Sequence, residues 1–147
     1  MLPEFTTDRL QLRPWQSGDV DTILAIYSQW EVARYLGRTP KAMTGRADAE
    51  AALARWTALS DGRLGVWAIV PVDEGAPVGS VLLKELPLSN DGGPSGDIEI
   101  GWHLRPQAWG RGYATEAATR VLEHAWRSSP SPIRRTPRPR RSAVGSA

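Results

Sequence analysis

The segment at residues 97–125 constrains the fold most, because it predicts a strand, a glycine turn and a helix in immediate succession. Residues 97–104 alternate between apolar side chains and polar or small ones, the period-two pattern of a strand with two unlike faces. The predicted apolar face of this strand contains Ile98, Ile100, Trp102 and Leu104. After the turn at residues 107–114, helical spacing predicts an apolar face formed by Ala114, Ala117, Val121, Leu122 and Ala125.

Three further strands are expected before this segment. Residues 9–13 alternate as a strand, and residues 66–70 and 78–83 are apolar runs bounded by glycine, proline and acidic turn residues. Residues 89–96, rich in Ser, Asn, Asp, Gly and Pro, are expected to form the loop that precedes the last strand. The last three strands then follow one another as a meander, which predicts a largely antiparallel sheet.

Two amphipathic helices are expected between the first strand and the meander. Residues 20–27 have apolar side chains spaced i, i+3, i+4 and i+7, with Ser17 as a plausible N-cap. Residues 49–59 predict a second helix with Thr44 as a possible cap, ended by residues 61–62. The order of elements predicts an α/β (α+β) fold, in which helices flank a mixed, largely antiparallel sheet.

Composition excludes several classes of protein. The 147 residues are enough for one domain, and 41% hydrophobic with 23% charged residues is ordinary for a globular protein. No apolar run approaches the roughly 18–20 residues of a membrane span, and the N-terminus lacks the pattern of a signal peptide. With no cysteine and two histidines, we expect neither disulfide nor thiol chemistry, and no metal site. A cytoplasmic location, away from membranes, is the expectation.

The net charge of +2 belongs to the C-terminal tail. Residues 128–147 contain five arginines and no acid, so residues 1–127 carry 13 basic and 16 acidic side chains, a net charge of −3. The tail is rich in Ser, Pro and Arg and has almost no large apolar side chain. Such a segment cannot bury enough surface to offset its ordering entropy, so we expect disorder there and a folded body at residues 1–127.

The turn at residues 107–114 has the properties of an anion site. Unpaired backbone amides converge at a helix N-terminus, where the helix dipole is positive. Gly110 and Gly112 lack a Cβ, so phosphate oxygens can approach the backbone, and Arg111 between them offers a charge-assisted contact. The turn is neither a Walker loop nor a three-glycine dinucleotide fingerprint. The alternative is a strand-to-helix turn that needs two glycines for its geometry alone.

The order of elements resembles the GNAT superfamily of acetyl-CoA-dependent N-acetyltransferases. Residues 7–14 (TDRLQLRP), Asp19 and residues 32–36 (VARYL) resemble its branch of ribosomal-protein N-terminal alanine acetyltransferases, of the RimJ and RimL type. Residues 98–102 (IEIGW) and 109–116 (WGRGYATE) resemble that branch as well. The resemblance extends over most of the part expected to fold. It implies a GNAT-like fold, acetyl-CoA as co-substrate, and a primary amine of a protein N-terminus or a small molecule as acceptor.

The family's cofactor signature, Gln/Arg-x-x-Gly-x-Gly/Ala, fits this turn in two registers. One uses Gln107, Gly110 and Gly112; the other, which we prefer, uses Trp109, Gly112 and Ala114. In either register the resemblance implies that backbone amides hold the CoA pyrophosphate, while the backbone of residues 102–104 pairs with the pantetheine arm. The implied cofactor-binding residues are Trp102, His103, Leu104, Trp109, Gly110, Arg111, Gly112, Tyr113, Ala114 and Thr115.

Acetyl transfer to an amine needs a base for the amine and a proton for the leaving thiolate. Glu99 is the better candidate base, directly or through water, and His103 on the same face is the second. The alternatives are a solvated strand residue for Glu99 and a local structural role for His103. We interpret Trp102 and Trp109 as packing residues, and Glu116 as a structural residue in the first helical turn.

The tail does not match the elements that come after this helix in the family. The family fold continues with a fifth strand, a further helix and two closing strands, and residues 128–147 show no such pattern. We therefore expect a truncated or frameshifted member, active or reduced to a CoA-binding remnant.

The sequence also allows two kinds of macromolecular partner. A natural basic tail would instead bind RNA or the ribosome without sequence specificity; other nucleic-acid binding is not expected. An unpaired last strand also allows a homodimer to complete the sheet.

Overall fold

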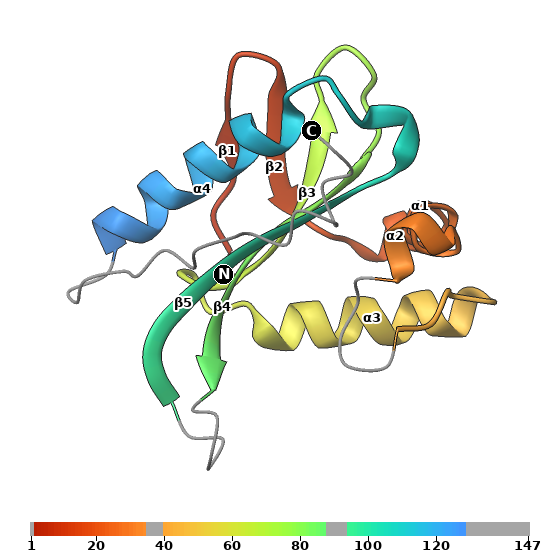
Figure 1. Cartoon of the computed structure of the whole chain (residues 1–147), viewed down its shortest axis with the longest axis horizontal. Coiled ribbons are helices and arrows are strands. Elements are labelled where there is room, and N and C mark those ends of the chain that lie inside the picture. Colours follow the sequence, from red (N-terminus) through yellow and green to blue (C-terminus); the bar gives the residue numbers. More distant parts are fainter. Residues whose placement is uncertain (1, 35–39, 88–93, 129–147) are drawn as a thin grey trace.

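The computed structural model describes residues 2–34, 40–87 and 94–128 (Figure 1). The C-terminal tail lies outside these residues except for Ser128, so the expected disorder there stays a prediction. In chain order the elements are β1 (Phe5–Thr6), β2 (Leu10–Pro14), a 3₁₀ turn (Ser17–Asp19), α1 (Val20–Tyr27), α2 (Trp30–Ala33), α3 (Arg46–Leu59), β3 (Gly65–Pro71), β4 (Gly79–Pro87), β5 (Pro94–Leu104), a second 3₁₀ turn (Pro106–Ala108) and α4 (Tyr113–Ser128).

The sheet has the strand order β1-β2-β3-β4-β5, and every neighbouring pair is antiparallel. This confirms the predicted α/β class with an antiparallel sheet flanked by helices. Strand β5 lies at one edge of the described sheet and pairs with β4 along most of its length, in the register Leu82↔Gly101. The turn between β3 and β4 contains Gly75 at φ 75°, a conformation that glycine adopts without strain.

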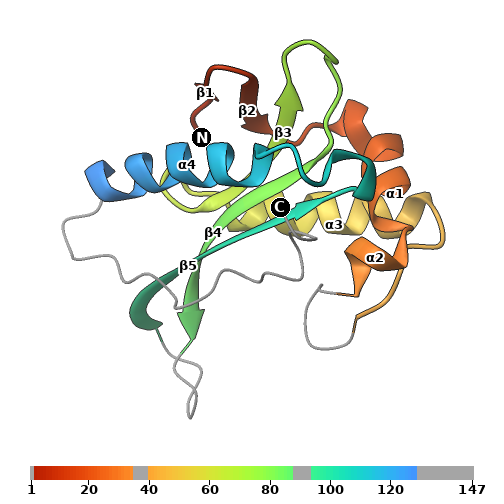
Figure 2. The same ribbon diagram turned by 45° about the horizontal axis from the view of Figure 1, so that its top comes forward.

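Helices cover both faces of the sheet (Figure 2). On one face α4 packs against alternate residues of the strands, among them Trp67, Ile69 and Val81. On the other face α1 and α3 pack against the residues between these, among them Val66 and Ala68 of β3. The predicted apolar face of α4 is confirmed, because Ala114, Ala117, Val121 and Ala125 are buried and Leu122 packs beside them.

The boundaries of several elements differ from the predictions. Strand β5 begins at Pro94 and β4 extends to Pro87, so cross-strand pairing takes in part of the predicted loop. The short elements β1 and α2 were not predicted, since neither is long enough to show a period. Leu59, expected on the apolar face of α3, is 41% exposed in its last turn. No helix among the described residues has the length and apolar character to cross a membrane.

The predicted helix caps were wrong in detail. Ser17 begins a 3₁₀ turn, and the Asp19 carboxylate accepts the hydrogen bond of the Gln16 amide at 2.9 Å. Asp19 also pairs with Arg13 of β2 at 2.8 Å, which ties the helix start to the sheet. At α3 the capping position is Gly45, and Thr44 instead donates its hydroxyl and its amide to a carboxylate in the first turn of α3. In both places a carboxylate in the first turn accepts hydrogen bonds from a residue that precedes the turn, and the hydroxyl expected to cap a helix amide does not do so.

The packing of the His124 side chain leads us to expect that the folded protein loses stability in acid. The imidazole of α4 lies 5.0 Å from the Phe5 ring and 5.9 Å from the Trp67 ring, centroid to centroid. Burial lowers the pKa of His124 below its usual value, although hydrogen bonds with the backbone of Arg63 and Gly62 act in the opposite direction. The unfolded chain therefore binds this proton at higher pH than the folded protein does.

We expect the free energy of unfolding to fall as the pH decreases through the ordinary histidine pKa of about 6.5. Urea unfolding at pH 7.5 and pH 5.5 measures this loss. His124→Gln should show a smaller loss between the two pH values. Equal losses for the wild type and the variant would contradict the assignment.

Candidate functional site

The turn between β5 and α4 takes its shape from two glycines. After the second 3₁₀ turn, Trp109 is extended, and Gly110 and Gly112 have φ values of 78° and 80°. Residues other than glycine adopt this backbone conformation at a cost of about 1–3 kcal/mol. Backbone geometry therefore favours glycine at both positions, as expected for a strand-to-helix turn. This geometry neither supports nor excludes the predicted anion site.

Several backbone amides of this turn have no hydrogen-bond acceptor within the described part of the chain. The first bond of the helix runs from the Glu116 amide to the Gly112 carbonyl at 3.1 Å. Among the described residues, no group accepts a hydrogen bond from the amides of residues 112–115, whereas Trp109 and Gly110 form a hydrogen-bonded turn that engages the Arg111 amide. A Cβ placed at Gly110 would meet nothing within 4 Å, so the space beside this amide is open. The four successive amides of residues 112–115, at the positive end of a 16-residue helix, suit a phosphate or pyrophosphate group.

The predicted cofactor residues at the start of α4 differ in their exposure. Tyr113 and Ala114 are 6% and 1% exposed, and Thr115 is exposed. Trp109 packs partly on the core and donates its indole N–H to the Leu104 carbonyl at 2.8 Å, which ties the turn to the end of β5. Trp102 also packs partly on the core, beside the buried Leu104. These contacts agree with a packing role for both tryptophans.

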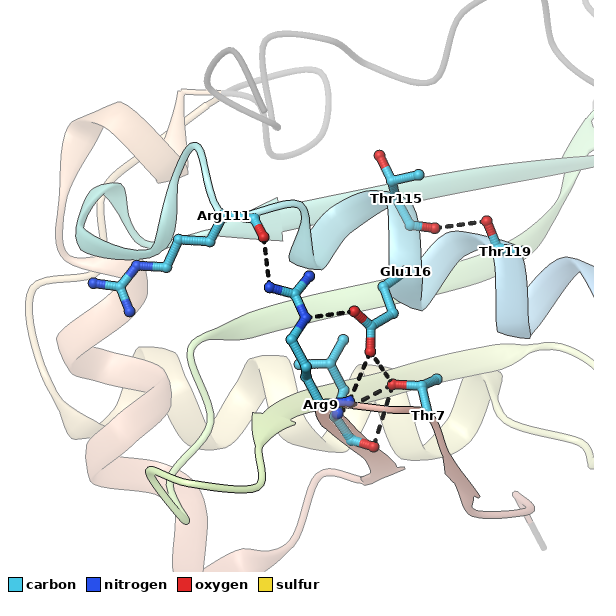
Figure 3. Close-up of polar contacts among 7 residues, drawn as sticks. Thr7, Arg9, Arg111, Thr115, Glu116 and Thr119 are labelled. Carbon is cyan, nitrogen blue, oxygen red and sulfur yellow. Dashed lines mark hydrogen bonds and ion pairs between the residues drawn. The ribbon is translucent and has the colours of Figure 1, made fainter.

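The Arg111 side chain is directed away from the first turn of α4 (Figure 3). It is more than half exposed, and its guanidinium lies 3.7 Å from the Glu74 carboxylate. Arg105 approaches the same carboxylate at 3.8 Å. The structure therefore does not bring the Arg111 charge over the free amides, where the sequence prediction had placed it.

Glu116 joins the first turn of α4 to the N-terminal hairpin, which strands β1 and β2 form with the turn between them (Figure 3). Its carboxylate accepts hydrogen bonds from the Thr7 hydroxyl, from the Arg9 amide at 2.9 Å and from Arg9 Nε at 2.8 Å. Partial burial raises the pKa of Glu116, but the bonds from Thr7 and Arg9 outweigh burial and hold it below its usual value. A structural role was predicted for Glu116; its partners, more than 100 positions earlier in the chain, were not.

Glu99 and His103 lie on the opposite face of β5 from the α4 core. The Glu99 carboxylate lies 3.5 Å from Lys84 Nζ on β4, and its side chain is 18% exposed. His103 Nδ1 forms a 2.9 Å hydrogen bond with the Tyr27 hydroxyl of α1. The two candidate bases are four residues apart along one strand, a separation of roughly 13 Å. Their side chains have different partners, Lys84 for Glu99 and Tyr27 for His103.

A buried chain of polar groups leads to His103. The Tyr27 hydroxyl also contacts Ser80 Oγ at 2.8 Å, and Trp15 donates its indole N–H to the same oxygen at 3.0 Å. Tyr27 and Ser80 are fully buried, and burial raises the pKa of Tyr27 well above its usual value, so it stays neutral. The helical spacing of residues 20–27 placed Tyr27 among the apolar side chains, and no functional role was predicted for Ser80. The signal for Ser80 was a hydroxyl within an otherwise apolar strand.

Beyond these residues, two further observations bear on what the site can hold. Strand β5 has a neighbour on one side only within the described sheet, so its outer edge offers backbone groups to an extended ligand. In the described part of the chain, no three histidine, aspartate or glutamate side chains gather in a way that would hold a metal ion.

Comparisons with known proteins agree on one family. The profile of the Acetyltransferase (GNAT) domain matches residues 9–139. The uncharacterized N-acetyltransferase YoaA of Bacillus subtilis is 28% identical over 127 residues, which cover 86% of this chain and 68% of that protein. The uncharacterized N-acetyltransferase p20 of Bacillus licheniformis is 27% identical over 123 residues, 83% of this chain and 65% of that protein. The chain thus spans about two thirds of the length of these relatives.

A solved structure extends the comparison to the fold. The ribosomal L7/L12 α-N-protein acetyltransferase RimL, in complex with coenzyme A, superposes with a TM-score of 0.65 at 14% identity. The aligned region covers 83% of this chain and 67% of RimL. At this identity the likeness concerns the fold, and it agrees with the resemblance to the RimJ and RimL branch.

Proposed function

Because the chain belongs to the GNAT family of acetyltransferases, which are acyltransferase enzymes, we propose that it transfers an acetyl group from acetyl-CoA to a primary amine. The observation that carries the proposal is the run of amides at residues 112–115 that have no acceptor among the described residues, at the positive end of α4. A pyrophosphate carries two or more negative charges and several acceptor oxygens, so it matches this donor set.

Acetyl-CoA would lie along the end of β5 and across the turn. We assign the pyrophosphate to the amides between Trp109 and Ala114, in the register Trp109–Gly112–Ala114, and the pantetheine arm to the outer edge of residues 102–104. The cofactor supplies the acetyl thioester and a thiolate leaving group. The chain's own residues would orient the thioester along the strand, where amide donors can polarise its carbonyl oxygen.

The proposed binding is tested by amide chemical shifts. Acetyl-CoA at millimolar concentration should shift the resonances of Gly110, Gly112 and Ala114, because their amides gain charged acceptors. Resonances of α3, on the other face of the sheet, should change little and serve as the internal control. A spectrum in which these three resonances do not move would exclude the proposed site.

Glu99 is the base that we propose for the amine, with His103 as the alternative. Glu99→Gln should lower kcat by about 100-fold, the usual contribution of a general base, with little change in acetyl-CoA affinity. Glu85→Gln, on the exposed end of β4, is the matched control and should keep full activity. If Glu99→Gln stays active while His103→Ala loses the same factor, the base is His103.

The acceptor is proposed as a protein N-terminus or a small molecule with a primary amine. The RimL protein carries the name of an α-N-protein acetyltransferase, which favours the first of these. A second candidate is acetyl-CoA binding without turnover. Release of free CoA in the presence of N-terminal alanine peptides or small amines separates the two candidates.

A further inference from the structure

Three residues connect the N-terminal hairpin to the first turn of α4 (Figure 3). The Glu116 carboxylate takes three hydrogen bonds, from the Thr7 hydroxyl and from the backbone amide and Nε of Arg9. The side chain of Glu116 is 20% exposed and that of Arg9 is 48% exposed, so this set is partly shielded from water. We call Thr7, Arg9 and Glu116 the hairpin clamp.

The terminal nitrogens of the Arg9 guanidinium lie against the glycine turn at residues 107–114. Its NH1 donates to the Arg111 carbonyl at 2.8 Å, and its carbon lies 4.9 Å from the centre of the Tyr113 ring. Its NH2 lies 3.3 Å from the place where a Cβ on Gly112 would stand. Arg9 therefore contacts Arg111 and Tyr113, on either side of Gly112, while Glu116 binds the same guanidinium through Nε.

The bond to the Arg111 carbonyl determines where the next amide points. In a planar trans peptide the C=O and the N–H point in opposite directions. Because Arg9 holds the Arg111 carbonyl on the side of the hairpin, the Gly112 N–H points away from the hairpin. That amide is one of those without an acceptor among the described residues.

We propose that the hairpin clamp orients the Gly112 amide toward the phosphate site, and so sets the affinity for the cofactor. This inference rests on the proposed function. Thr7, Arg9 and Glu116 are positioning residues, since they act through the Arg111–Gly112 peptide and need not touch the ligand. Without the clamp, the Arg111–Gly112 peptide group is free to rotate, because glycines stand at positions 110 and 112.

The clamp and simple electrostatics predict opposite effects for Glu116→Gln. Glu116 is a negative charge at the helix end where a polyanion would bind, so its removal alone should tighten binding. If the carboxylate positions Arg9, its removal should weaken binding. Arg9→Lys keeps the positive charge but loses the planar fork that reaches Glu116 and Arg111 together, so it should weaken binding as well.

The experiment measures acetyl-CoA dissociation constants by calorimetry for the full chain and its variants. We expect Glu116→Gln and Arg9→Lys each to raise Kd by about tenfold, the size of a lost hydrogen bond to a charged group. Glu123→Gln on the same helix, whose carboxylate lies 4.0 Å from Arg120, is the matched control and should leave Kd unchanged. The Gly112 amide resonance of the ligand-free protein should shift in the two clamp variants and stay in place in the control.

The outcomes separate the two proposals. Wild-type protein that binds acetyl-CoA, with Glu116→Gln binding equally well or more tightly, overturns the clamp and leaves the proposed function standing. Wild-type protein that does not bind acetyl-CoA overturns the proposed function, and with it the clamp's role in affinity. Weaker binding by Glu116→Gln with an unmoved Gly112 resonance also overturns the clamp, because the loss would then have another origin.

Discussion

Gly112→Ala is expected to weaken acetyl-CoA binding by about 10-fold to 100-fold. The alanine would have to adopt the φ of 80° that Gly112 has, at a cost of about 1–3 kcal/mol. Its Cβ would also stand 3.3 Å from Arg9 NH2, closer than ordinary contacts. Rotation of the Arg111–Gly112 peptide relieves both, and that rotation turns the Gly112 amide away from the proposed phosphate site. Isothermal titration calorimetry measures the change in Kd.

The matched control for this prediction is Gly75→Ala. Gly75 has a φ of 75° and, like Gly110, nothing within 4 Å of an added Cβ, but it lies in the turn between β3 and β4. Both alanine variants should lose similar stability, as measured by Tm, and only Gly112→Ala should lose affinity. If the two variants bind acetyl-CoA equally well, the amide at Gly112 has no part in binding.

Gly79→Ala is expected to cause the largest loss of stability, about 3 kcal/mol or more. A Cβ at Gly79 would stand 1.9 Å from the His103 carbonyl oxygen and 2.9 Å from Leu104 Cα. These are backbone atoms of the neighbouring strand, so no rotamer change relieves the overlap. The ends of β4 and β5 must separate, which also moves His103 and the residues assigned to the pantetheine arm. Urea unfolding measures the loss, and acetyl-CoA affinity should fall with it.

Gly101→Ala tests whether the effect belongs to Gly79 alone. Gly101 lies in the same strand pair, but an added Cβ would stand 3.5 Å from the Leu82 side chain, an ordinary contact. This variant should change the free energy of unfolding by no more than about 1 kcal/mol. If Gly79→Ala and Gly101→Ala lose the same free energy of unfolding, the overlap with the backbone of β5 is not the cause of the loss.

Local patterns in the sequence were sufficient for most elements of the fold. The alternation at residues 97–104 predicted the two faces of β5, and helical spacing predicted the buried face of α4, because both depend on neighbours along the chain. Caps and strand ends were less well predicted. Ser17 and Thr44 were expected to cap helix amides; instead Asp19 and Asp48 accept hydrogen bonds from Gln16 and Thr44, since which acceptor faces an amide depends on how the chain enters the helix.

The candidate site divides in the same way. The glycine turn at residues 107–114 and its place between a strand and a helix were visible in the sequence, and so was the resemblance to the family. The partners of Glu116 were not visible, since Thr7 and Arg9 lie more than 100 positions away. The same holds for His103, whose hydrogen-bond partner Tyr27 is 76 positions away.

The glycine turn at Gly110 and Gly112, the helix that comes after it and the apolar faces on either side could be predicted from local sequence, because each is set by the residues' own conformational freedom and spacing. The direction of the free amides, and the charges that stand beside them, depend instead on tertiary contacts. Arg111 turns toward Glu74, and Arg9 from the distant hairpin takes the place beside the turn. Contacts between residues far apart in sequence form only when the sheet brings their strands together, and a one-dimensional pattern does not contain that distance.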